Sequence, residues 1–133
     1  MLQEQIAITK NVFKYTFTEA NLAASQTNTD IPVSGADHTL HLLPFDGYIV
    51  GYAINKSAAH TAGSLDFDIN INGTSTLTIA ADTTSVYASL DTPDEPFNAG
   101  DTLGIDYTSD GSLDATTVDV VIDIFVVFTE QRF

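Results

Sequence analysis

The sequence predicts an all-β protein, an antiparallel β-sandwich of about eight strands formed by one domain. Three observations support this prediction. Segments with apolar residues at every second position recur along the chain at spacings of roughly 8–14 residues, with turn residues between them. No window of eleven or more residues shows the 3.6-residue periodicity of an amphipathic helix. The chain has 133 residues and 44% apolar content, so it can bury a substantial core.

The first half of the chain contributes four expected strands. Residues 12–18 place Phe13, Tyr15 and Phe17 on one face, and shorter candidates follow at 31–33 and 38–43. Residues 47–55 form the fourth strand. Its two glycines predict a β-bulge or the close approach of another backbone.

The clearest element is a β-hairpin. Apolar residues alternate with acidic or amide residues from Leu65 to Ile71, the pair Asn72-Gly73 follows, and residues 74–79 run back. Asn-Gly favours a two-residue turn because both turn positions need a positive φ. Three further strands are expected over 85–90, 102–108 and 117–129, separated by turn-rich segments.

The last expected strand is apolar on both faces near its C-terminal end. The face opposite the core begins polar but continues with Val121, Phe125 and Val127. One face of an antiparallel sandwich sheet normally contacts water, so either a loop or another subunit must cover these side chains. Because the chain is acidic and shows no sign of a lid, we predict a subunit contact at these three residues, in a closed symmetric oligomer.

The charge of the chain excludes several classes of partner. Four Lys and Arg against eighteen Asp and Glu give a net charge of −14, which repels nucleic acid and anionic membranes. No segment approaches the ~20 apolar residues of a membrane-spanning helix. The first residues lack the basic and apolar regions of a secretory signal, so we expect a protein made in a cytoplasm.

The charge is also unevenly distributed. Residues 1–18 contain Lys10 and Lys14 against Glu4 alone, whereas the remainder of the chain carries the acidic excess. This segment is either a docking arm in front of a sandwich domain over 19–133, or a first strand with two solvated lysines. If it is an arm, its candidate docking residues are Lys10, Phe13 and Lys14.

We find no catalytic constellation and expect neither enzymatic activity nor a cofactor. The absence of cysteine excludes disulfides and thiolate metal sites, and there is no G-x-S-x-G motif. His38 and His41 lie three residues apart on an expected strand, so they point to opposite faces. We expect these two and His60 at the surface or at a sheet edge.

Acid pairs are the remaining candidates for chemistry. Asp66 and Asp68 share one strand face, and Asp119 and Asp123 share another. If the two strands are neighbours, four carboxylates could bind Ca²⁺, or two could support glycosidase-type acid–base catalysis. The simpler interpretation, which we favour, is that these acids occupy the water-facing positions of alternating strands and maintain solubility.

Five segments carry a family resemblance: 44–51 (PFDGYIVG), 62–65 (AGSL), 72–73 (NG), 97–101 (FNAGD) and 120–128 (VVIDIFVVF). Together they resemble the small jelly-roll domains of tailed-phage virion proteins, which include head decoration (cementing) proteins, head fibres and fibre tips. The FNAGD turn and the last strand are also similar to trimeric jelly rolls of the C1q/TNF type. The resemblance implies an eight-stranded jelly roll, commonly trimeric, without catalytic residues. It also implies capsid docking through the N-terminal segment, with Lys10, Phe13 and Lys14 as candidates.

Three functions follow from these observations. The first, which we predict, is a non-enzymatic virion protein that binds the major capsid protein of the shell as a homotrimer, in a decoration or head-fibre role. The second is a carbohydrate- or receptor-binding fibre tip, in which tyrosines stack on sugars; the candidates are Tyr48, Tyr52, Tyr87 and Tyr107. The third is a glycan-processing enzyme, which the shortage of His and Arg disfavours.

Overall fold

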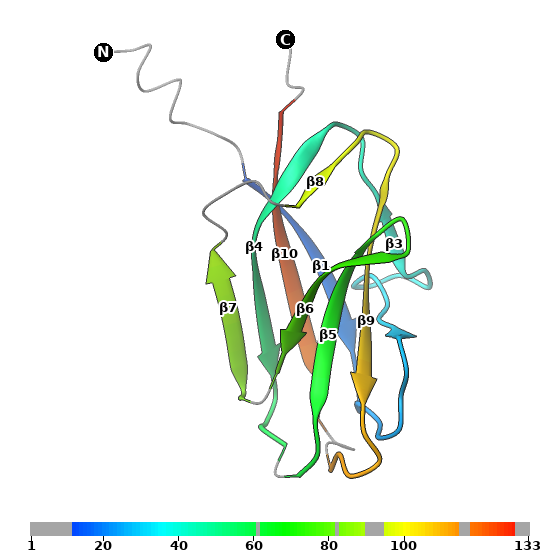
Figure 1. Cartoon of the computed structure of the whole chain (residues 1–133), viewed down its shortest axis with the longest axis vertical. Coiled ribbons are helices and arrows are strands. Elements are labelled where there is room, and N and C mark those ends of the chain that lie inside the picture. Colours follow the sequence, from blue (N-terminus) through cyan, green and yellow to red (C-terminus); the bar gives the residue numbers. More distant parts are fainter. Residues whose placement is uncertain (1–11, 61, 82, 90–94, 115–117, 130–133) are drawn as a thin grey trace, which may run out of the picture.

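A computed structural model describes residues 12–60, 62–81, 83–89, 95–114 and 118–129. The described residues form ten strands in two packed antiparallel sheets and contain no helix (Figure 1). Sheet A comprises β1 (Val12–Glu19), β10 (Val120–Phe128), β4 (Gly47–Lys56), β7 (Ser85–Ser89) and β8 (Pro96–Phe97). Sheet B comprises β2 (Thr29–Asp30), β3 (Leu40–Leu42), β9 (Thr102–Ser109), β5 (Leu65–Ile71) and β6 (Thr74–Ala80).

The strand order is that of a jelly roll. Sheet A runs β1-β10-β4-β7 and sheet B runs β2-β9-β5-β6, so the first strand lies beside the last and consecutive strands often change sheet. Two of the ten strands are continuations: β3 pairs β9 as β2 does, and β8 pairs β4 as β7 does. Merging each such pair leaves eight strands, which confirms the predicted fold class.

The hairpin of sheet B forms as the sequence predicts. Asn72 and Gly73 connect β5 to β6 with φ values of 53° and 79°, the left-handed region that this turn requires. The inward face of β5 is buried at every position, with Leu65 and Ile69 fully inaccessible. A register shift between Ile69 and Asn70 places Ser75 opposite Asn70.

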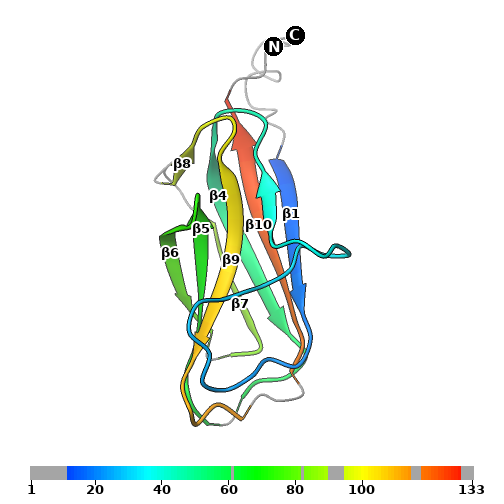
Figure 2. The ribbon, with the colours of Figure 1, turned by 90° about the vertical axis from the view of Figure 1, so that its right-hand side faces the viewer.

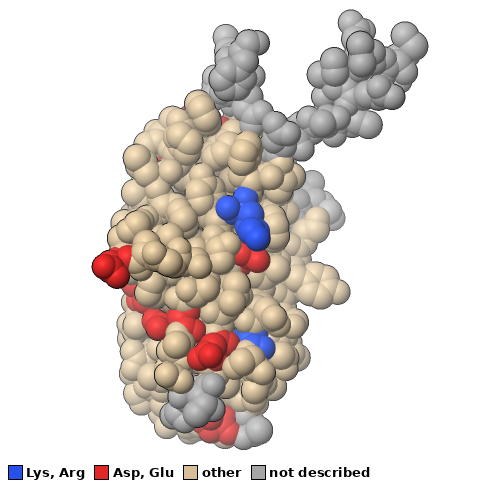
Figure 3. Space-filling model, turned by 180° about the vertical axis from the view of Figure 1, so that it is seen from behind, with Lys and Arg blue, Asp and Glu red and all other residues tan. Residues whose placement is uncertain are grey.

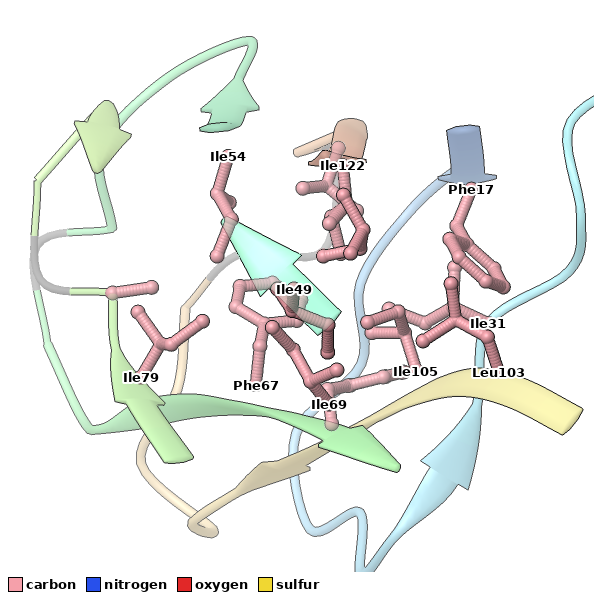
Figure 4. Close-up of a cluster of buried hydrophobic side chains, with 14 of the residues drawn as sticks. Phe17, Ile31, Ile49, Ile54, Phe67, Ile69, Ile79, Leu103, Ile105 and Ile122 are labelled. Atoms are coloured by element: carbon pink, nitrogen blue, oxygen red, sulfur yellow. The ribbon is translucent and has the colours of Figure 1, made fainter. Parts of the chain in front are cut away.

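The core lies between the two sheets (Figure 4). β10 contributes Ile122, Ile124 and Val126, none of which has exposed surface, as its alternation predicts. The facing strands of sheet B contribute Phe67, Ile69, Leu103 and Ile105, each at most 1% exposed. Each such side chain stabilises the fold by about 1.5–3 kcal/mol through burial.

Both predicted effects of the β4 glycines occur. Residues Gly51 and Ile49 pair with the consecutive residues Phe125 and Val126, so Val50 is the extra residue of a β-bulge. A Cβ on Gly51 would lie 2.8 Å from the carbonyl oxygen of Ala88 on the neighbouring β7. Only glycine lets the two backbones approach this closely.

Residues 12–18 are part of the sandwich. They lie in β1, which pairs with β10 along its whole length, and its Phe17 is fully buried in the core. The chain after β1 wraps across the adjoining flank (Figure 2). There Ile31 donates its N–H to Ile105 of sheet B, and Ser34 donates to Thr16 of sheet A, which joins the two sheets. Residues 1–11, including Lys10, lie outside the described residues.

Candidate functional site: the outer face of sheet A

Sheet A presents an outer face with little charge. Its side chains follow from the strand registers, because residues opposite one another share a face. They are Val12, Lys14, Thr16 and Thr18 of β1; Val121, Asp123, Phe125 and Val127 of β10; Tyr48, Gly51, Ala53 and Asn55 of β4; and Ser85, Tyr87 and Ser89 of β7. Lys14 and Asp123 are its only charged members, and most of the surface seen from this side is uncharged (Figure 3).

The three predicted interface residues differ in exposure. Val121 is 43% exposed, and Phe125 is partly exposed between Lys14 and Gly51. Val127 lies between Val12 and Tyr48 and is only 6% exposed. Its own chain covers most of Val127, so this residue offers little surface to another subunit. Val121 and Phe125 remain available for a contact.

Asp123 is charged but hydrogen-bonded within this face. Its carboxylate accepts a hydrogen bond of 2.5 Å from the Thr16 hydroxyl on the neighbouring strand. Tyr87, the most exposed large side chain, has 81% of its surface accessible and lies on the same rung as Ala53. An uncharged face with exposed apolar and aromatic side chains is typical of an interaction surface.

A second exposed apolar area lies at the end of the sandwich where β1 begins and β10 ends, here called the terminal pole. Phe128 is its centre, with ring centroids 5.2 Å from Phe13, 5.6 Å from Phe45 and 6.0 Å from Phe97. Val12, Phe13 and Phe45 are 55%, 43% and 38% exposed. The predicted docking residue Phe13 therefore lies at this pole, and the exposed Lys14 follows it on β1 with its side chain on the outer face of sheet A.

The four aspartates considered for calcium are not brought together. Asp66 and Asp68 lie on β5 of sheet B, whereas Asp123 lies on β10 of sheet A and Asp119 just precedes it. β5 and β10 are not neighbours, so the condition for a shared site is not met. Asp119 instead accepts a hydrogen bond from the Asn21 N–H, at 3.0 Å. Within the described part of the chain, no three His, Cys, Asp or Glu side chains are placed to hold a metal ion.

Of the tyrosines proposed for sugar stacking, only Tyr48 and Tyr87 share a surface, the outer face of sheet A, and they are not neighbours: Tyr87 is opposite Ala53, five residues along β4 from Tyr48. Tyr107 is 3% exposed and its hydroxyl accepts a hydrogen bond from the Ala23 N–H. Tyr52 packs against the core, whereas Tyr87 is exposed on the outer face of sheet A. Stacking platforms need neighbouring exposed rings, so this arrangement does not favour a carbohydrate site.

His41 lies on an edge strand, as the sequence predicts, but its ring is half-buried. It packs against Tyr15 and Phe17 with ring centroids 4.6 and 5.0 Å away, and its Nε2 has no hydrogen-bond partner in the described structure. Burial lowers the pKa of His41, opposed by a hydrogen bond with the Thr16 backbone and assisted by the nearby His38.

The outer face of sheet B contrasts with that of sheet A. It carries Asp30, Asp66, Asp68 and Asp106, and no Lys or Arg occurs on its strands. Asp106 is 8% exposed and accepts a hydrogen bond of 2.7 Å from the Asn70 amide. The sequence analysis did not identify this pair. The only signal was the acid-amide alternation of β5, which does not reveal which strand lies beside it.

No described helix is long and apolar enough to cross a membrane. No protein-family model matches the chain, and no curated protein matches its sequence. The fold, however, is found in solved structures. A chain of the acid-stable capsid of Helicobacter pylori bacteriophage KHP30 is 9% identical, with a TM-score of 0.54 over 90% of each chain.

A chain of the capsid asymmetric unit of cyanophage Pam1 is 12% identical, with a TM-score of 0.52 over 91% of this chain and 87% of that one. GITRL from bushbaby is 12% identical over 90% of this chain, with a TM-score of 0.38, too low to support an argument. The first two likenesses confirm, at the level of the fold, the resemblance to phage virion proteins.

Proposed function

We propose that this chain is a non-enzymatic structural protein of a phage virion, which binds the capsid shell as a homotrimer in a decoration or head-fibre role. The observation that carries the proposal is the fold. Nearly the whole chain, about 90%, superposes on chains from two phage capsids, with TM-scores above 0.5. A match over about nine-tenths of both chains supports a common architecture rather than one shared hairpin.

The distribution of charge supports a division of roles among the surfaces. Two copies that each carry −14 repel one another, so association is favoured where the contacting surface carries little charge. The outer face of sheet A meets this condition, and Val121 and Phe125 offer it apolar area. The acidic outer face of sheet B is the natural solvent side of such an assembly.

The terminal pole is the proposed shell contact. It combines three exposed apolar side chains with Lys14, in a chain that has only four Lys and Arg. Aromatic side chains are enriched in the centres of protein interfaces, where they act as buried anchors. Phe13 and Phe45 are the candidate anchors and Lys14 the candidate charged contact.

Co-sedimentation tests the proposal. The purified chain is mixed with empty shells of the major capsid protein from the same genome and pelleted, and we expect saturable binding. Phe45→Glu adds a charge to the terminal pole and should abolish binding, whereas Ser112→Glu adds the same charge to an exposed turn at the opposite end and should bind normally. Failure of the unmodified chain to pellet with shells would refute the proposed function.

The N-terminal segment needs a separate variant. Removing residues 1–18 would delete most of β1 and with it the fully buried Phe17, so loss of binding would report only unfolding. Removing residues 2–11 leaves β1 intact. If this shorter deletion binds as well as the full chain while Phe45→Glu does not, the pole itself is the contact and Lys10 has no part in it.

A further inference from the structure

Three aspartates lie on one rung across the outer face of sheet B. Asp106 of β9 is opposite Asp30 of β2 on one side and opposite Asp68 of β5 on the other. Like charges at directly opposite positions of neighbouring strands repel one another. The charged groups that act on Asp106 are these two acids. β3 also pairs with β9, but the ring of its His41 packs on the inner side against Tyr15 and Phe17.

Asp106 is poorly solvated as an anion. Its residue is 8% exposed, and the Asn70 amide donates to Oδ2 at 2.7 Å. Its Oδ1 is buried and accepts no hydrogen bond from any described group. A buried charged oxygen without a donor is unfavourable, whereas a protonated carboxyl can use the same oxygen to donate.

Asp68 is placed to act as the acceptor. Its Oδ1 receives hydrogen bonds from the Thr78 hydroxyl and, at 3.3 Å, from the Ser75 hydroxyl. Both of these donors come from β6, on the side of Asp68 away from Asp106. The two carboxylates therefore have unequal surroundings. Asp68 accepts hydrogen bonds from two hydroxyls, whereas Asp106 is buried and accepts one from an amide.

The electrostatic environment acts in the same direction. Burial raises the pKa of Asp106, the hydrogen bond from Asn70 opposes this, and the carboxylates of Asp68 and Asp30 raise it further. An open depression of about 470 Å³, lined in part by Asp30 and Asn70, gives solvent access to this part of the sheet. Asp68 is itself partly exposed, so a proton can reach the pair without unfolding the sheet.

We propose that Asp106 and Asp68 form a proton-binding site, in which Asp106 takes up a proton from solvent and, as a neutral carboxyl, donates a hydrogen bond to the Asp68 carboxylate. The bound proton removes one of the two opposed charges and supplies the missing bond at Asp106 Oδ1. The site makes sheet B more stable as pH falls. This stabilisation is complete below the ordinary Asp value of 3.8 and is lost as pH rises through the folded pKa of Asp106. The inference does not depend on the proposed virion function.

Asp106→Asn is the principal test, because an amide at this position mimics the protonated carboxyl. Thermal and urea unfolding are measured from pH 7.5 to 4.5 for the unmodified chain and the variant. We expect the variant to be the more stable at pH 7.5 and its advantage to shrink as pH falls, with a slope approaching about tenfold in the folding constant per pH unit. Comparing the two proteins at each pH cancels the titration of His41, which both retain.

Asp66→Asn is the matched control. It removes the same charge from the same face of β5, but the rung neighbours of Asp66 are Thr108 and Ala80 rather than acids. Its stability difference from the unmodified chain should stay constant with pH. If Asp66→Asn and Asp106→Asn show the same pH profile, general charge repulsion explains both and the proposal is wrong.

Two further measurements complete the test. Asp68→Asn removes the acceptor charge but leaves Asp106 buried, so the stability that the unmodified chain gains on acidification should be smaller in this variant. An undiminished gain would refute the shared proton. Millimolar Ca²⁺ should leave the melting temperature of the unmodified chain at pH 7.5 unchanged. A rise that Asp106→Asn abolishes would mean that a metal ion, not a proton, occupies the pair.

Discussion

The outer faces of the two sheets cover the same core but differ in charge. The outer face of sheet B carries four aspartates and no basic residue, whereas that of sheet A carries one lysine, one hydrogen-bonded aspartate and the exposed Val121. Inward positions are mostly apolar in both sheets, so the outward positions are freer to vary. Their difference therefore reports what each face meets: water on sheet B and, in our proposal, sister subunits on sheet A.

The largest expected effect tests whether both faces depend on one core. Ile122→Ala in β10 and Ile105→Ala in β9 each remove a side chain that is at most 1% exposed, one from each sheet. Each should lower the free energy of unfolding by about 2–5 kcal/mol, because a cavity is left between the sheets. Urea denaturation checks this. Two separate transitions, or a loss in only one variant, would show that the sheets do not unfold as a unit.

The next prediction compares how a charged substitution on each outer face changes self-association of the protein. Val121→Glu on sheet A should weaken self-association by about 2 kcal/mol, roughly thirtyfold, because it places a charge in the uncharged contact. Leu42→Glu is the control: Leu42 lies on β3 of sheet B and is 68% exposed, more than Val121 at 43%. Sedimentation velocity over a concentration series measures both. A stronger effect for Leu42→Glu would assign the contact to sheet B.

A smaller effect concerns pH at the seam between the sheets, where His41 of β3 packs on β1. Burial holds the pKa of His41 below its ordinary value of 6.5, so the stability it contributes is complete above 6.5 and is lost as pH falls through the folded pKa. This sign is opposite to that of Asp106. His41→Phe keeps an aromatic ring and should gain stability relative to the unmodified chain between pH 7.5 and 5, measured by thermal unfolding. A pH-independent difference would contradict it.

The smallest effect on folding is expected for Tyr87→Ser. Because Tyr87 is 81% exposed at the edge of sheet A, its loss should change the free energy of unfolding by less than about 0.5 kcal/mol. Association should nevertheless weaken, since the ring belongs to the proposed contact face. Calorimetry and light scattering on the same sample compare the two quantities. Unchanged self-association would indicate that the contact between subunits lies near β1 and does not include β7.

Local features of the fold were predictable because they depend on neighbouring residues. The turn at Asn72-Gly73 and the inward alternation of β10 follow from residue types alone, and both are confirmed. The short β8 was not predicted, because two residues carry no periodicity. The glycines of β4 predicted a bulge, but they did not predict at which residue the bulge occurs.

Relations between distant strands were not predictable from the pattern. A strand's alternation says which residues share a face but not which strand lies beside it. For this reason the pairing of Asp68 with Asp106 was missed, and Asp66 was considered together with Asp123 although the jelly-roll order puts them in different sheets. The burial of Val127 also depends on its neighbours, Val12 and Tyr48, which only the register identifies.

The antiparallel pairing of the first and last strands has a consequence for any linkage to this protein. Val12 is opposite Val127, so the described chain enters and leaves the sandwich at one end. A tether attached at either terminus therefore holds the same end. The turns at residues 57–60 and 110–114 lie at the opposite end of the sandwich, which therefore points away from the attachment point (Figure 1).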